Sequence, residues 1–206
     1  MSTTRLSTGV ETLDRRFDGG LPAGSLFALV APPEAQAELL VAALASARHT
    51  RYYSTARPAA EVAETTRRGD RSMDVVHDSP EALAADPESD LADLPAESNV
   101  VVDATNGFEE LDRERYLDFL GALKRRLEET GGVGLLYCLA AEDAPRHRTL
   151  TLHRADVVAR LELVRTTLTV ETRLYVTKFR GGRALREPLK LALTDVVTVD
   201  TSRDIA

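Results

Sequence analysis

Residues 26–40 form a short apolar stretch, a turn and a segment rich in alanine and leucine, the strand-loop-helix order in which many proteins hold nucleotide phosphates. Such a loop needs glycines so that backbone N–H groups can surround the phosphates, a lysine for the outer phosphates and a Ser or Thr hydroxyl for Mg²⁺. This loop has other residues at those positions, namely Ala31, Pro32, Pro33, Glu34, Gln36, Ala37 and Glu38. The carboxylates of Glu34 and Glu38 would repel phosphate oxygens by roughly 1 to 4 kcal/mol. The sequence therefore predicts that no nucleotide binds here in the usual mode.

Asp103 is a second residue that could do chemistry. It ends the apolar run of residues 99–102, which is typical of a buried parallel strand. A carboxylate at the end of such a strand can orient Mg²⁺ through water. The interpretation we favour is that Asp103 caps the turn at residues 104–107, because aspartate before a glycine-containing loop is common on turn chemistry alone.

Lys178 and Arg180 lie beside Gly181 and Gly182, and the surrounding segment, residues 165–190, contains more cations than acids. One interpretation is an exposed β-hairpin turn at the two glycines, flanked by cations. The other is a subunit interface to which both cations contribute. A partner for the basic segment could be DNA or an acidic protein. We favour the protein, because no aromatic stacking platform accompanies these cations.

Two stretches before the loop resemble the RecA superfamily ATPase core, in its KaiC/RadA-like archaeal branch. Residues 6–14 (LSTGVETLD) and 18–25 (DGGLPAGS) match its pattern S-T-G-hydrophobic-x-x-L-D followed by G-G-[IL]-P-x-G-S. The next family motif, the Walker A loop G-x-P-G-S-G-K-T, is degenerate here, and only prolines survive. The resemblance spans most of residues 7–199. It implies an α/β fold of the RecA-like P-loop NTPase type, with a mostly parallel central sheet flanked by helices and antiparallel strands at the C-terminal end.

The resemblance also implies roles for single positions. Ala31 stands at the first loop glycine, Ala37 at the lysine and Glu38 at the Mg²⁺-binding hydroxyl. Residues 56–57, Ala and Arg, stand where the family carries an acidic pair that includes the catalytic base. Asp103 corresponds to the Walker B acid. Lys178 and Arg180 match a K-x-R-G signature, in which both cations reach the nucleotide of a neighbouring subunit.

These positions together predict a catalytically inactive domain, a pseudo-ATPase without a cofactor or metal, that acts as a regulatory or scaffolding partner or assembles with itself. One alternative is an ATPase that binds ATP and Mg²⁺ by an altered loop, with Asp103 and the Lys178 and Arg180 of an adjoining protomer. Another is an accessory protein of DNA recombination or repair.

Composition sets further limits. The chain has 206 residues, of which 43% are apolar, so we expect one domain over residues 1–206. No run approaches the roughly 18 apolar residues of a membrane span, and no leader is evident, so we expect a cytoplasmic protein. Cys138, the only cysteine, is flanked by apolar residues and excludes a disulfide framework. The net charge of −7 argues against bulk affinity for nucleic acid. Lysine occurs only three times, which fits a halophilic archaeon or, equally, a GC-rich genome.

Hydrophobic periodicity predicts the elements that position these residues. We expect helices over residues 35–48, 58–68 and 111–130, and strands over residues 73–77, 156–163, 168–177 and 189–193. Residues 78–98 are acidic and interrupted by prolines, which predicts an exposed connection with a turn of helix at most. The four histidines show no metal-ligand spacing.

Overall fold

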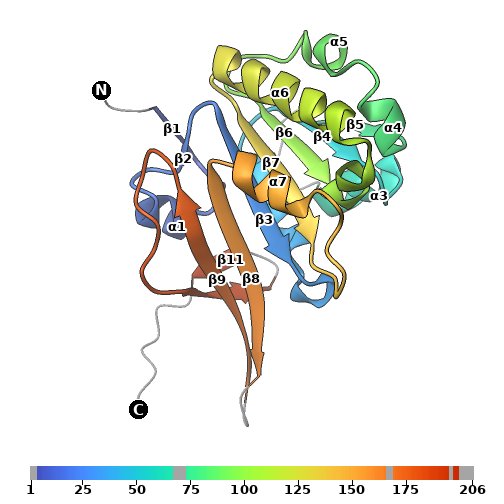
Figure 1. Ribbon diagram of the computed structural model, residues 1–206. Helices are drawn as coiled ribbons and strands as arrows, with labels where there is room; N and C mark the ends of the chain where they lie inside the picture. Colours follow the sequence, from blue (N-terminus) through green and yellow to red (C-terminus); the bar gives the residue numbers. More distant parts are fainter. Residues whose placement is uncertain (1–3, 67–72, 166–168, 195–196, 200–206) are drawn as a thin grey trace.

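A nine-stranded sheet runs through the centre of the molecule (Figure 1). The computed structural model describes residues 4–66, 73–165, 169–194 and 197–199. The strand order is β11-β10-β9-β8-β3-β7-β6-β4-β5, and neighbours from β8 to β5 are parallel, whereas those from β8 to β11 are antiparallel. Its strands are β3 (Ser25–Ala31), β4 (Thr50–Ser54), β5 (Met73–His77), β6 (Asn99–Asp103), β7 (Val133–Leu139), β8 (Val157–Arg165), β9 (Val170–Phe179), β10 (Leu189–Leu193) and β11 (Val197–Val199). This is the α/β architecture, with antiparallel strands at the C-terminal end, that the sequence predicts.

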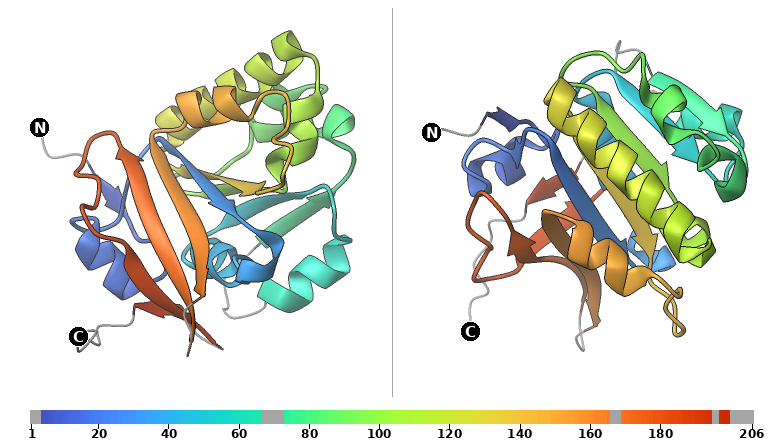
Figure 2. Two further views of the ribbon diagram at one scale, coloured as in Figure 1. Left: turned by 60° about the horizontal axis from the view of Figure 1, so that its bottom comes forward. Right: turned by 45° about the horizontal axis from the view of Figure 1, so that its top comes forward.

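Helices cover both faces of the parallel strands (Figure 2). The helices are α1 (Glu11–Arg16), α2 (Glu38–Ser46), α3 (Ala59–Thr66), α4 (Pro80–Leu83), α5 (Pro87–Leu91), α6 (Arg113–Thr130) and α7 (Arg148–Arg154). Residues from α1, α2 and α3 share one hydrophobic core, and residues from α4, α5 and α6 share the other. All residues of β3 are buried, because a parallel strand covered on both faces needs a continuous apolar run. None of the helices in the described part of the chain combines the length and apolar character of a membrane span.

Residues 78–98 differ from the exposed connection that we expected. Ser79 and Asp86 each accept a hydrogen bond as N-caps, and a proline follows each of them at the first helical position. The two short helices α4 and α5 therefore form here. Leu83, Leu91 and Leu94 are buried in the core below α6. The segment is therefore amphipathic, which its acidic composition does not indicate.

The turn after β9 also differs from a tight hairpin at the two glycines. Leu189 of β10 pairs with Leu174 of β9, several residues before the end of β9 at Phe179. Residues 180–188 therefore form a longer connection. The predicted strands themselves are present at close to the expected bounds, except that Leu168 lies outside the described residues.

The N-terminal motif has a structural role in this molecule. Asp14 accepts hydrogen bonds from the Ser7 hydroxyl (2.5 Å) and from the Thr8 backbone N–H and hydroxyl (2.7 Å each). Gly9 adopts φ +81°, and a Cβ on this residue would lie 2.1 Å from the backbone oxygen of Ala43 in α2. The motif thus lets the N-terminal segment pack directly on α2, the helix that follows the loop after β3. A short two-stranded sheet of β1 (Arg5–Leu6) and β2 (Leu21–Pro22) completes this region.

Candidate functional site

The loop after β3 uses its own backbone for internal contacts. Pro32 and Pro33 have no N–H, and the Ala35 N–H donates to the carbonyl of Pro32 (3.0 Å) within the single 3-10 turn η1 (Pro33–Ala35). The methyl groups of Ala31 and Ala37 are buried in the core. A phosphate site needs several N–H groups that point outward together. In this loop two prolines contribute no N–H and the Ala35 N–H is already engaged, which reduces the number of donors. Helix α2 begins at Glu38, later than expected, because Gln36 adopts a left-handed conformation.

Negative charge gathers at the same edge. Glu38 lies in the first turn of α2, where a carboxylate interacts favourably with the helix dipole. Burial raises the pKa of Tyr137 on β7 to about 12, and the carboxylates of Asp103 and Glu38 act in the same direction. The edge of the sheet at the carboxyl ends of β3, β6 and β7 therefore carries two carboxylates. Doubly wound sheets usually bind ligands at such an edge.

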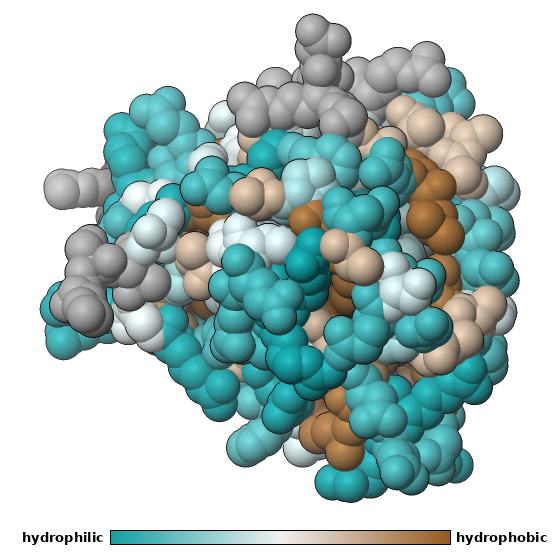
Figure 3. Space-filling model, turned by 90° about the horizontal axis from the view of Figure 1, so that it is seen from above, coloured by the Kyte–Doolittle hydropathy of each residue, from teal (hydrophilic) through white to brown (hydrophobic). Residues whose placement is uncertain are grey.

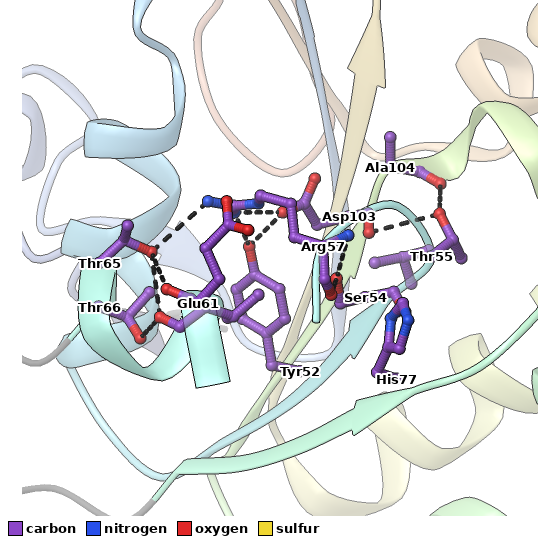
Figure 4. A network of polar contacts seen from close by, with 12 residues as sticks. Tyr52, Ser54, Thr55, Arg57, Glu61, Thr65, Thr66, His77, Asp103 and Ala104 are labelled. Carbon is purple, nitrogen blue, oxygen red and sulfur yellow. Dashed lines mark hydrogen bonds and ion pairs between the residues drawn. The ribbon is translucent and has the colours of Figure 1, made fainter. Parts of the chain in front are cut away.

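Asp103 lies at this edge and is held by two side chains from β4 and the turn after it (Figure 4). The Tyr52 hydroxyl donates to Asp103 Oδ2 at 2.5 Å, and Arg57 Nη2 lies 2.6 Å from the same oxygen. Arg57 Nη2 also donates to the Tyr52 oxygen at 3.1 Å. The Asp103 side chain is only 7% exposed, so the guanidinium neutralises a buried carboxylate. Our favoured prediction that Asp103 caps the following turn is wrong, because Tyr52 and Arg57 take its hydrogen bonds.

A tight turn aims Arg57 at Asp103. The Ser54 hydroxyl donates to the Arg57 carbonyl (2.6 Å) and accepts from the Arg57 N–H (3.2 Å). Although burial works against the charged form, the hydrogen bond to Asp103 raises the pKa of Arg57. Burial, followed by the charge of Asp103, raises the pKa of Tyr52. Tyr52 is therefore a permanent hydrogen-bond donor and Arg57 a permanent cation.

The Arg57–Asp103 ion pair should contribute to stability. We expect Arg57→Ala to lower the free energy of unfolding by about 2 to 4 kcal/mol, because it leaves a buried carboxylate with one neutral partner. Adding Asp103→Asn to Arg57→Ala should recover at least half of the loss, since the charge is then gone. Urea unfolding of the wild type and of both variants measures this. A loss below about 0.5 kcal/mol for Arg57→Ala, as for an exposed ion pair, would contradict it.

Lys178 and Arg180 lie far from Asp103 in the sheet order and bind α7 of their own chain. Lys178 Nζ donates to the carbonyls of Leu152 (3.0 Å) and His153 (2.8 Å) at the C-terminal end of that helix. Burial, then the neighbouring Arg180, lowers the pKa of Lys178. Arg180 Nη2 donates to the His153 carbonyl (3.3 Å), and Arg180 Nη1 lies 3.4 Å from Asp156 Oδ1; the Arg180 side chain is 54% exposed. Both cations therefore stabilise a helix C-terminus, and their contribution to a subunit interface stays a prediction.

Other cations of residues 165–190 also have partners. Arg173 and Lys190 both form ion pairs with Glu171 (2.8 Å each). Arg165, Arg183 and Arg186 are exposed. The basic segment thus presents less positive charge than its composition indicates, which weakens the case for a DNA surface.

Asp156 links α6 to the start of β8. Its carboxylate accepts from Lys124 Nζ (2.6 Å) and from the Leu26 N–H (3.0 Å). Burial opposes ionisation, but these two partners lower the pKa of Asp156. Because the native pKa is lowered, ionised Asp156 stabilises the fold at a pH above the unfolded pKa of about 3.9. This stabilisation is lost as the pH falls through the native pKa.

We therefore expect Asp156→Asn to lower the free energy of unfolding by about 1 to 3 kcal/mol at pH 7. The difference from the wild type should shrink steadily below about pH 4. Urea unfolding of both proteins at several pH values measures it, and an unchanged difference at the lowest pH would contradict the assignment.

A second buried ion pair lies where η2 (Thr105–Glu110) meets α7, and sequence reasoning missed it. Glu109 is fully buried and accepts from Arg148 Nε at 2.7 and 2.9 Å and from the Thr151 hydroxyl at 2.5 Å. Arg148 Nη2 also donates to the Leu139 carbonyl at the end of β7 (3.2 Å). Nearby, burial raises the pKa of the Cys138 thiol to about 12, so this cysteine is inert at neutral pH.

Among the residues that the structure describes, no three histidine, cysteine or acidic side chains are grouped to hold an ion. The residues at the loop do not fit ATP with Mg²⁺ in the usual mode. Glu38 stands where the resemblance expects the hydroxyl that coordinates the metal, and Arg57 binds the carboxylate that the resemblance expects to orient it.

The sheet order, the connections on both of its faces and the loop-and-Asp103 edge define a KaiC-like fold of the RecA type. The chain is similar in structure to the KaiC-like protein PH0186 from the hyperthermophilic archaeon Pyrococcus horikoshii OT3, with a TM-score of 0.78 at 15% sequence identity. The likeness covers 96% of this chain and 99% of that one. In sequence, residues 5–206 match the model of the family described as "Family of unknown function (DUF7125)", and the chain belongs to this family. No curated protein matches the sequence.

Proposed function

We propose that residues 1–206 form one RecA/KaiC-like domain of the archaeal KaiC/RadA-like branch that has lost nucleotide chemistry and serves as a scaffolding or regulatory partner. The observation that carries this proposal is the 2.6 Å contact between Arg57 and Asp103. In an active relative the corresponding acid orients Mg²⁺, which neutralises its charge. In this chain a covalently attached cation performs that neutralisation, so the carboxylate has no need of a metal.

The replacement is internally consistent. Arg57 occupies the position at which the resemblance expects an acidic residue, and its hydrogen bonds with the Ser54 side chain point it at Asp103. The Walker A equivalent is degenerate in sequence, and its turn is closed by proline and by an internal hydrogen bond. The replaced residues of the loop after β3 and the cation Arg57 after β4 both support the proposal that this chain has no nucleotide chemistry.

The proposed environment is the cytoplasm of a salt-adapted archaeon, which the net charge of −7 and the scarcity of lysine support. Assays therefore belong at high salt as well as at low salt. The preferred partners are a protein or a second copy of the chain, since the net charge of −7 disfavours DNA and Glu171 pairs with two of the cations of residues 165–190.

ATP hydrolysis measured over a wide range of protein concentrations tests the proposal. We expect no turnover above the buffer background in either salt condition, because loop lysine, hydroxyl and base are all replaced. Turnover that rises with protein concentration and is abolished by Asp103→Ala would instead establish an ATPase assembled between protomers.

A further inference from the structure

A preformed groove lies between the α4–α5 segment and α6, on the side of the molecule seen in Figure 3. Its volume is about 650 Å³, which is within the range of ligand-binding pockets. Small or apolar residues and charged residues line it together. The small or apolar set, called the floor below, comprises Ala84, Ala85, Pro87, Leu117, Gly121 and Ala122. The charged set, called the rim below, comprises Asp86, Glu88, Asp112, Glu114 and Asp118, with Arg115 and Arg125.

Both rim arginines are engaged in holding the walls together. Arg115 donates to the carbonyls of Ala84 (3.3 Å) and Glu81 (2.7 Å), and Arg125 forms an ion pair with Glu88. These contacts fix the α4–α5 segment against α6. A binding surface that is rigid before its partner arrives loses less entropy on binding. The groove is thus built in advance, with a surplus of negative charge.

Gly121 is the most informative residue of the floor. It lies in the middle of an 18-residue helix, where glycine is destabilising relative to alanine. A Cβ here would approach only the flexible end of Arg125, at 3.3 Å, so packing within the chain does not require glycine. Glycine does allow a foreign backbone to come close.

We propose that this groove binds a basic amphipathic helix of a partner protein, with its small apolar face over Gly121 and its Lys or Arg side chains against the acidic rim. A groove beside a long helix, with an apolar floor and a charged rim, is a recurring way to hold an amphipathic helix. Charge complementarity selects a basic partner. A second copy of this chain fits less well, because its net charge is −7 and its exposed Arg183 and Arg186 lie in a loop. The inference rests on the proposed partner-binding role and names its partner chemistry.

Fluorescence anisotropy with a synthetic probe tests it. The probe is a labelled helical peptide of about 15 residues, about four turns, with lysines on one face and alanines and leucines on the other. A matched peptide carries glutamates in place of the lysines. In about 0.1 M salt, where charges act over about 10 Å, the lysine peptide should bind and the glutamate peptide should not.

Three variants locate the binding surface. Glu114→Lys with Asp118→Lys should weaken lysine-peptide binding at least about tenfold. Gly121→Leu, which changes no charge and favours the helix, should also weaken it severalfold by filling the floor. Glu64→Lys with Glu187→Lys reverses two exposed acids outside the groove at the same net charge, and should change affinity less than about twofold.

Equal losses in both charge-reversal pairs, or full binding by Gly121→Leu, would overturn the proposal in favour of diffuse attraction. Failure of the lysine peptide to bind would also overturn it. Light scattering that shows a dimer lost on Glu114→Lys with Asp118→Lys would assign the groove to a second copy instead. Nucleotide binding by the wild type would refute only the proposed inactivity, since the groove lies on another part of the molecule.

Discussion

Gly9→Ala should lower the free energy of unfolding by about 2 to 5 kcal/mol. Two effects combine at this residue. The φ of +81° is unfavourable for any residue with a Cβ, which costs about 1 to 2 kcal/mol. The Cβ would also lie 2.1 Å from the backbone oxygen of Ala43, and backbone atoms of a packed helix cannot move aside without displacing α2. Such overpacking adds about 1 to 3 kcal/mol.

Gly131→Ala is the matched control. Gly131 ends α6 at φ +69°, but a Cβ there would meet nothing within 4 Å. Only the conformational cost remains, and we expect about 1 kcal/mol. Urea unfolding of both variants separates the two contributions. Equal losses in the two variants would show that Gly9 is retained for its φ alone, and that the N-terminal motif does not press on α2.

Arg148→Met should be destabilising by a similar amount, about 3 to 5 kcal/mol, since it leaves the carboxylate of Glu109 unpaired at a fully buried position. Combining Arg148→Met with Glu109→Gln should recover a large part of this loss, because the amide carries no charge. Thr151 can still donate to it. The remaining loss reflects the contact of Arg148 with the end of β7.

Thermal and urea unfolding of the single and double variants provide the measurement. If the double variant is as unstable as Arg148→Met, the charge of Glu109 is not the cause, and packing of the Arg148 side chain is. The cycle also tests whether the contacts of α7 with η2 and with the end of β7 serve stability.

Much of the architecture could be predicted from local pattern. The buried strands β3 and β6 are continuous apolar runs, and β5 and β9 show their β-branched residues plainly. The amphipathic period of α6 is equally clear, and Tyr116, Phe119 and Leu120 are among the residues that it buries. By contrast, α4 and α5 were missed, because helices of four and five residues are too short to show a helical period in the sequence.

The candidate site could be predicted only in part. The degenerate loop and Asp103 follow from the positions they occupy, whereas the partners of Asp103 depend on register. Ser54 pairs with Asp103, so Tyr52, two residues earlier, points to the same face and reaches the carboxylate. The sequence does show Arg57 as a cation where the resemblance expects an acid. That Arg57 contacts Asp103 follows only from the turn that the Ser54 hydroxyl closes. The Glu109–Arg148 pair spans 39 residues, and no local pattern reveals it.

The N-terminal motif has a role that does not depend on the loop after β3. Asp14, Thr8 and Gly9 hold the N-terminal segment on α2 by hydrogen bonds and close packing. These contacts serve the fold, whereas the loop glycines and lysine of a working P-loop serve the nucleotide. Under the proposed function, the chain needs the first set and not the second.

Titration calorimetry with ATP and Mg²⁺ tests the central proposal most directly, namely that the loop after β3 and the Asp103 edge bind no nucleotide with its metal. The wild type should show no binding up to millimolar ligand at low and at high salt. The variant Arg57→Ala should show none either, since the loop still lacks its cation and hydroxyl. A micromolar dissociation constant for the wild type would contradict the account.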